Sequence, residues 1–256
     1  MTKYIAKFPR ENGLIDWSTT ENKTWEKLIA RQIDTVQNRA CDEYMHGLHE
    51  LNLSKNAVPQ LPDVNKILKK TGWEMVPVTG TVQITEFFTL LKNKKFPVAN
   101  FIRIPEELDY LQQPDIFHEL FGHGPLLLNS HYANFMQWYG AMALTFSPKK
   151  RKILSRLFWY TIEFGLLHTP KGLRILGGGI LSSYAETIFC LESSKPKRLQ
   201  FDLTTVLQTD YDYQSIQPNY FILNNFKQLF ELQTNQLLLK LIDINDEDIH
   251  NTFINC

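Results

Sequence analysis

The chain has 256 residues, enough for one large domain or two small ones, and 43% of them are hydrophobic. Lysine plus arginine and aspartate plus glutamate each number 27, so the formal net charge is zero, which argues against a nucleic-acid partner. No stretch is apolar enough to cross a membrane, and the N-terminus lacks the pattern of a signal peptide. Three scattered cysteines, Cys41, Cys190 and Cys256, are too few for a disulfide framework, so we expect a soluble, cytoplasmic, globular protein.

The first half of the chain predicts helices and two short strands. Residues 1–17 show no clear period and are expected to lie on the domain as an arm. Ser18 and Glu21 form a capping box, after which apolar residues at three-to-four spacing predict an amphipathic helix that runs to about Leu48. Further elements are a short helix opened by Pro62, strands over residues 73–78 and 96–102, and a helix between them capped by Thr85.

The second half predicts more helix. Apolar periodicity indicates a helix over residues 130–144, and Pro148 starts another, which Gly165 closes. Residues 174–181 contain three consecutive glycines and are expected to form a strand or hairpin with close backbone contacts. The remaining predicted elements are a helix over residues 184–191 capped by Ser182 or Ser183, a short helix, a strand near Tyr220 and a terminal helix over residues 223–241. The expected fold is mainly α with a few short strands.

Residues 114–125, PDIFHELFGHGP, carry the strongest chemical signal. Neutral imidazoles such as those of His118 and His123 are common metal ligands. Their i, i+5 spacing would place them about 140° apart on an unbroken α-helix, unlike the i, i+4 pair of zinc proteases. Both can reach one ion only if the helix stops between them. Gly122, which tolerates a positive φ, and the Gly-Pro pair after His123 predict a short helix that ends near Phe121.

Two histidines require at least one further protein ligand. Glu119 follows His118 directly and points about 100° away on a helix, so it is a poor ligand beside its neighbour. Glu163 is the better candidate because it is the only acid in the apolar segment 157–167, and buried carboxylates are normally paired or bound to metal. The alternative for Glu163 is a buried carboxylate that pairs with an arginine or the backbone.

Two histidines and one carboxylate with open positions are the ligand set of non-haem iron(II) oxygenases, and the same set serves catalytic zinc in hydrolases. The i, i+5 spacing and the aromatic residues around Glu163 favour iron over zinc. A histidine pair with a purely structural role in the core is the third alternative.

The motifs PDIFHELFGHGPLL, FWYTIEFGL and GGGILSSYAE together resemble those of the pterin-dependent aromatic amino acid hydroxylases, most closely the short bacterial phenylalanine 4-monooxygenases. The resemblance extends from KTWEKL at Lys23 through PQLPDVNKIL and VPVTG to QPNYF at Gln217. It covers most of the chain and implies a single catalytic domain over residues 1–256, with no room for an amino-terminal regulatory domain.

The resemblance also implies a mechanism and a set of site residues. Iron(II) would be bound by His118, His123 and Glu163, with tetrahydropterin as cofactor and O₂ as co-substrate, and phenylalanine would be hydroxylated to tyrosine. The residues implied for the amino acid are Arg103, which grips its α-carboxylate, and Tyr110, Leu111, Pro114, Trp159, Gly179 and Ser182. Those implied for the pterin are Gly80, Val82, Phe87, which stacks on its ring, and Glu119, which reaches it through water.

Some positions depart from the family pattern. Leu111-Gln112 stands where animal members have Thr-Pro, and Ile84 occupies a pterin-loop position that is usually small and polar. The family's tetramerising tail is absent or shortened, so a monomer or dimer is expected. Short length favours phenylalanine as substrate. The nearest alternative is the same chemistry on tryptophan or tyrosine, and a more distant one is a zinc-dependent hydrolase.

Overall fold

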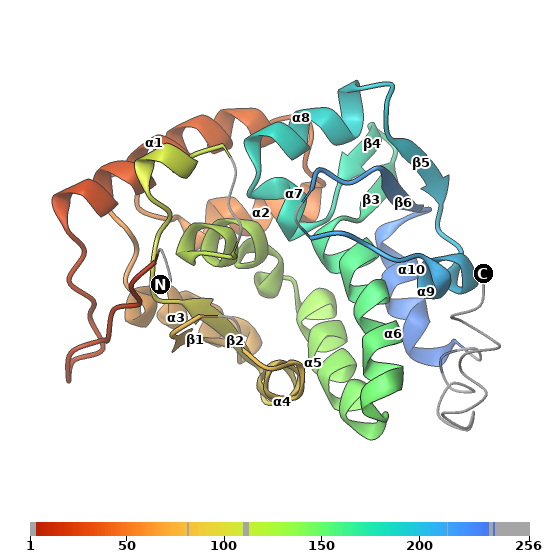
Figure 1. The fold of residues 1–256 in the computed structure, drawn as a ribbon, viewed down its shortest axis with the longest axis horizontal. Helices are drawn as coiled ribbons and strands as arrows, with labels where there is room; N and C mark the ends of the chain where they lie inside the picture. Colours follow the sequence, from red (N-terminus) through yellow and green to blue (C-terminus); the bar gives the residue numbers. More distant parts are fainter. Residues whose placement is uncertain (1–3, 81, 110–112, 214, 236–237, 239–256) are drawn as a thin grey trace.

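The computed structural model describes residues 4–80, 82–109, 113–213, 215–235 and 238, and helices make up most of this part of the chain (Figure 1). The predicted mainly α fold class is therefore confirmed. The predicted capping box begins the first helix, because Ser18 Oγ accepts from the Glu21 N–H while the Glu21 carboxylate accepts from the Ser18 N–H. The helices of the first half are α1 (Thr19–Val36), α2 (Asp42–Leu51), α3 (Leu61–Leu68), η1 (Lys69–Thr71) and α4 (Ile84–Lys92).

The predicted continuous helix to about Leu48 is wrong, because the chain turns between α1 and α2. Asn38 adopts a left-handed conformation with φ 61°. The backbone that follows then pairs with β4 (Gly172–Ile175) instead of continuing the helix. Ile175 N–H donates to Arg39 O at 2.8 Å, and Cys41 N–H donates to Ile175 O at 2.9 Å. This long-range bridge overrides the local helical periodicity.

Two small sheets flank the helices. The first pairs β1 (Glu74–Val78) with β2 (Lys95–Ala99) in parallel, and α4 is the crossover between them. Gln83, and not the predicted Thr85, is the N-cap of α4. The second sheet has the strand order β4-β3-β6-β5, in which β3 (Leu166–Thr169) and β4 form an antiparallel hairpin. The strand β6 (Asn219–Leu223) runs parallel to both β3 and β5 (Lys197–Gln200).

The predicted helices that follow the histidine motif are confirmed. Asn129 caps α5 (Ser130–Thr145) and Ser147 caps α6 (Pro148–Phe158), and these two helices lie side by side below the larger sheet in Figure 1. Ser183, the second of the two predicted caps, begins α8 (Tyr184–Glu192). The predicted short helix and late strand are α9 (Leu203–Gln208) and β6.

The predicted terminal helix over residues 223–241 is wrong in its described part. Leu223 ends β6, and Asn225 caps a helix of only six residues, α10 (Phe226–Glu231). A 3-10 turn, η6 (Leu232–Thr234), follows it. Of the rest of the predicted helix, Asn235 and Leu238 alone lie within the described residues. An asparagine that caps a new helix interrupts the apolar pattern on which the prediction depended.

One contiguous apolar core underlies both sheets. Trp25, Tyr44, Phe88, Phe135 and Leu154, each from a different helix, are at most 1% exposed. The N-terminal arm lies against this body, since Lys7 N–H donates to Asn100 O at 2.8 Å and Tyr4 stacks on Phe101. Within the described ranges, no helix has both the length and the apolar character needed to cross a membrane.

Gly140 on α5 marks a close approach to α4. A Cβ added at Gly140 would lie 2.6 Å from Leu91 Cβ and 2.7 Å from Phe88 O. We expect Gly140→Ala to lower the free energy of unfolding by about 1–3 kcal/mol, because a helix backbone cannot yield as a flexible side chain would. Urea unfolding measures the change. Gly80→Ala is the control, because a Cβ there meets nothing within 4 Å, and equal losses in both variants would contradict the packing explanation.

Candidate metal and pterin site

The two histidines of the motif lie on one turn that is wider than an α-helical turn. The segment η3 (His118–His123) is π-helical, and Gly124 N–H donates to Glu119 O, five residues earlier, at 3.1 Å. Because π-helical hydrogen bonds join residues i and i+5, side chains five residues apart return to nearly the same face. The predicted helix end near Phe121 is therefore wrong. The helix continues through the motif, and a wide turn rather than a break brings the imidazoles together.

A second wide turn presents the carboxylate. At the end of α6 the chain enters the π-helical segment η5 (Trp159–Glu163), in which Phe164 N–H donates to Trp159 O at 2.8 Å. Glu163 Oε1 lies 3.2 Å from His123 Nε2, and Glu163 Oε2 lies 3.7 Å from His118 Nε2. The two Nε2 atoms are 3.1 Å apart. The structure thus brings the three predicted ligands together from two segments that are far apart in sequence.

The spacing of these three side chains fits a metal ion. Three donors about 2.1 Å from a six-coordinate ion, on one face of it, are about 3.0 Å from one another. The observed separations of 3.1, 3.2 and 3.7 Å are close to this value. In the part of the chain that the structure describes, this is the one group of three His, Cys, Asp or Glu side chains whose ligand atoms lie within 4.8 Å of one another.

Hydrogen bonding and charge keep the donors in their metal-binding forms. Ser182 Oγ donates to Gly179 O at 3.3 Å and so accepts the Nδ1 proton of His118 at 2.9 Å, which leaves the Nε2 lone pair facing the centre. Burial lowers the pKa of His118 to about 4, so its imidazole is neutral. Burial alone would raise the pKa of Glu163, but His123, His118 and the backbone of Gly179 outweigh it and hold that pKa below its ordinary value.

Glycines let two backbones meet at this centre. A Cβ at Gly122 would lie 2.5 Å from Gly178 O, and a Cβ at Gly178 would lie 2.5 Å from His123 Cε1. The short helix α7 (Gly178–Leu181) therefore packs directly on η3. The predicted close backbone contact at the glycine run is confirmed, although the strand there ends at Ile175. Gly122 is not in the left-handed region, so its predicted use of a positive φ is wrong.

A cavity of about 180 Å³ opens beside the three ligands. The predicted pterin contacts Gly80, Val82, Phe87 and Glu119 line it, together with Pro114, His118 and Glu163. Glu119 belongs to this wall and not to the ligand group. Burial raises the pKa of Glu119 well above its ordinary value, and the carboxylates of Glu163 and Asp115 add to the effect. These influences favour the protonated form, which can donate a hydrogen bond into the cavity.

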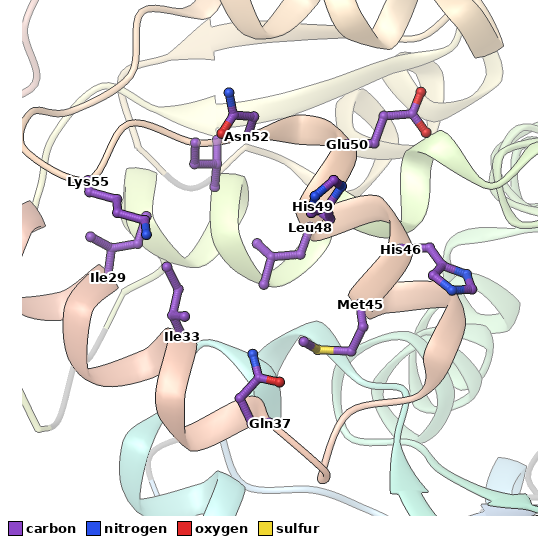
Figure 2. Close-up of a pocket in the computed structure, with 11 residues that line it drawn as sticks. Ile29, Ile33, Gln37, Met45, His46, Leu48, His49, Glu50, Asn52 and Lys55 are labelled. Atoms are coloured by element: carbon purple, nitrogen blue, oxygen red, sulfur yellow. The ribbon is translucent and has the colours of Figure 1, made fainter.

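A larger cavity, about 980 Å³, lies between α1 and α2 (Figure 2). Ile29, Ile33 and Leu48 form part of its wall, and His46 and His49 stand at its rim. It contains none of the predicted site residues. The candidate site is therefore identified by the convergence of ligand atoms and not by the size of its cavity.

Arg103 is held by a carboxylate whose role the sequence pattern did not reveal. Its Nε and Nη2 donate to Asp115 Oδ2 and Oδ1 at 2.9 and 3.0 Å, and both residues are at most 5% exposed. Asp115 also accepts from the His118 N–H at 3.0 Å. Burial would raise the pKa of Asp115, but the Arg103 guanidinium holds it below its ordinary value. The sequence offered one indication of this role, since Asp115 is the one acid in the otherwise apolar start of the motif, PDIF.

Trp159 begins the π-helical segment that ends at Glu163, but it is not part of the smaller cavity's lining. Its ring centroid is 4.4 Å from that of Phe164. Phe164 in turn borders the ligand group, since a Cβ at Gly179 would be 3.0 Å from both Phe164 Cε2 and Glu163 Oε2. Trp159 Nε1 donates to Gln217 Oε1 at 3.0 Å, a partner that sequence spacing did not predict. The predicted residues Tyr110 and Leu111 lie outside the described residues.

The fold and this ligand set define a helix-rich, metal-dependent enzyme domain with a two-histidine, one-carboxylate centre. The family model of the biopterin-dependent aromatic amino acid hydroxylases matches residues 3–238, and the chain belongs to this family. Membership in this family removes the zinc-hydrolase and structural-histidine alternatives.

Individual relatives agree with this assignment. The chain is 45% identical over 238 residues to a phenylalanine-4-hydroxylase of Pseudomonas aeruginosa, across 93% of this chain and 90% of the relative. The phenylalanine hydroxylase structure of Colwellia psychrerythraea superposes with a TM-score of 0.90 at 49% identity, covering 94% and 93% of the two chains. The Chromobacterium violaceum enzyme, solved with iron(III) and oxidised 7,8-dihydrobiopterin, gives a TM-score of 0.85 at 41% identity, covering 93% and 87%.

We expect Glu163→Ala and His118→Ala to abolish iron retention and turnover, because each removes one of three protein ligands. Elemental analysis of the purified variants measures bound iron. His49→Ala is the matched control, since it removes an exposed histidine at the rim of the larger cavity and should leave the iron content unchanged. A Glu163→Ala protein that keeps its iron and full activity would reject the ligand assignment.

Proposed function

We propose that the protein is an iron- and tetrahydropterin-dependent monooxygenase that converts L-phenylalanine to L-tyrosine with O₂. The observation that carries this proposal is the convergence of His118, His123 and Glu163 beside a cavity lined by the predicted pterin contacts. Its family and the phenylalanine-4-hydroxylases among its relatives support phenylalanine as the substrate.

In the proposed enzyme the three ligands hold iron(II), and iron with reduced pterin supplies the activation of O₂. The chain itself binds and orients the substrate and the pterin, and it excludes water from the site. Ser182 keeps His118 in the tautomer that offers Nε2 to the metal. On the pterin side, Phe87 offers a ring for stacking, Gly80 and Val82 offer backbone groups, and Glu119 offers a hydrogen bond.

Arg103 receives the α-carboxylate of the amino acid in this proposal. Asp115 engages two of its five N–H groups, so the guanidinium plane is oriented before substrate arrives. Preorganisation of this kind reduces the entropy lost on binding. Trp159 and Pro114 form the walls of the ring slot, and Gly179 and Ser182 border the backbone of the substrate. The slot directs the para carbon of the ring toward the metal.

The same proposal includes a cytoplasmic location and an assembly no larger than a dimer. The buried, unpaired thiols of Cys41 and Cys190 support a reducing compartment.

Product analysis tests the proposed activity. The purified protein is supplied with iron(II), tetrahydropterin and ¹⁸O₂, and phenylalanine, tryptophan or tyrosine is added separately. We expect phenylalanine to be converted to tyrosine that carries one ¹⁸O atom. Tyrosine formation should depend on both the pterin and O₂. Faster hydroxylation of tryptophan or tyrosine would reject the substrate assignment, and no oxygen uptake with any of the three would reject the activity.

We expect Arg103→Ala to raise the KM for phenylalanine by about tenfold or more, because the α-carboxylate loses a charged partner. The KM for the pterin should not change, since Arg103 does not line the smaller cavity. Arg10→Ala, which removes an arginine from a pair on the exposed arm, is the control and should leave both constants unchanged. Steady-state kinetics with phenylalanine and the pterin varied in turn measures both constants. An unaltered KM for phenylalanine in Arg103→Ala would reject the proposed binding of the α-carboxylate by Arg103.

A further inference from the structure

We propose that Gln217 is a positioning residue: it fixes the indole of Trp159 in the wall of the substrate slot and thereby the alignment of the phenylalanine ring. This assignment rests on the proposed function, because the slot role of Trp159 comes with it. The contact joins two parts of the chain, since Trp159 opens η5 while Gln217 lies two residues before β6.

The orientation of the Gln217 side-chain amide is determined by its neighbours. The residue is 1% exposed, and its Nε2 donates to Asp212 O and Ser215 O, each at 2.7 Å. Carbonyl oxygens only accept and an indole N–H only donates, so Oε1 must face Trp159 Nε1, at 3.0 Å. Rotation of the amide would break all three hydrogen bonds. Gln217 therefore presents a fixed acceptor to Trp159.

The backbone of Gln217 is anchored as well. Its N–H donates to Glu186 Oε1 at 3.0 Å, and Tyr220 OH donates to the same oxygen. Glu186 lies on α8 and is 5% exposed, while Tyr220 is the second residue of β6 and is fully buried. Gln217 is thus tied to a helix and to the central part of the larger sheet, which makes it a rigid reference point for a side chain that contacts it.

The two ring contacts of Trp159 restrain the indole across its plane more than along it. Tyr211 stacks on the indole at 4.3 Å with an interplanar angle of 12°, and Phe164 packs against it at 4.4 Å. Offset stacking tolerates sliding parallel to the ring plane. A directional hydrogen bond at Nε1 resists that sliding. Gln217 therefore supplies a constraint that the two neighbouring rings cannot supply.

Sliding of the slot wall matters because the reaction depends on where the substrate ring lies. A misplacement of about 1 Å in a bound substrate can lower the rate by about a hundredfold. A loosened Trp159 should weaken phenylalanine binding and allow turnovers in which pterin is oxidised without forming tyrosine. The cavity lined by the predicted pterin contacts includes neither Trp159 nor Gln217, so pterin binding should be unaffected.

The test replaces Gln217 with Met, which keeps the length of the side chain and removes its hydrogen bonds. In Gln217→Met we expect the phenylalanine KM to rise about three- to tenfold, the span that one hydrogen bond supports. The fraction of tetrahydropterin oxidation events that yield tyrosine should fall, while the iron content and the KM for the pterin stay as in the wild type. That fraction is a ratio, so a smaller amount of folded enzyme would not change it. Gln200→Met, at an exposed glutamine on β5, is the control.

A double variant separates action through Trp159 from an independent effect. Trp159→Phe removes the indole N–H, so adding Gln217→Met to it should raise the phenylalanine KM no further, whereas independent effects would multiply. If Gln217→Met does not fold, Gln217→Asn is used with the same expectations, because it keeps the amide but cannot reach the indole.

The assignment of Gln217 would be overturned if the wild-type protein makes tyrosine and the Gln217 variants keep both the wild-type KM for phenylalanine and the wild-type ratio of tyrosine formed to tetrahydropterin oxidised. So would multiplied KM effects in the double variant. A wild-type protein that makes no tyrosine would instead overturn the proposed function.

Discussion

The site depends on the convergence of His118, His123 and Glu163 on one point, which regular α-helices do not provide for this sequence. On an α-helix the two histidines would be about 140° apart. The π-turn of η3 returns them to one face, and the π-turn of η5 ends at the glutamate. Such turns are rare and occur frequently at functional sites. Here the surrounding core stabilises them, since Leu120 and Phe121, between the histidines, are fully buried.

The irregular parts of the fold support this convergence. The chain turns between α1 and α2 so that Cys41 N–H can reach Ile175 O, and this bridge fixes the end of β4. Two residues later the glycine run begins, and Gly178 brings the backbone of α7 against the imidazole of His123. A side chain at that position would occupy the space of the imidazole. The interrupted helix and the glycine run therefore both bring a backbone without side chains up to the predicted metal ligands.

Sequence pattern predicted the elements whose stability is local. The helices α5 and α6 follow from apolar periodicity and from the breaks that flank them, and the ligand residues follow from their chemistry and from the family motifs. The pattern failed where long-range contacts decide the backbone. Nothing near Cys41 indicates a bridge to Ile175, and nothing in the i, i+5 spacing distinguishes a broken helix from a widened one. Both outcomes place the imidazoles together, so the predicted ligands converge although the predicted backbone was wrong.

The partners of the predicted residues were the least visible in the sequence, because they depend on tertiary distance. Asp115 accepts from the Arg103 guanidinium and also from the backbone N–H of His118. One buried carboxylate thus connects the proposed substrate-carboxylate site to the first residue of the turn that carries the two predicted histidine ligands. The Arg103–Asp115 pair has no net charge, so recognition of a substrate carboxylate there depends on the fixed geometry of the remaining N–H groups more than on a positive field. Rigid partners behind the residues proposed to contact the substrate, Asp115 for Arg103 and Gln217 for Trp159, would hold that geometry.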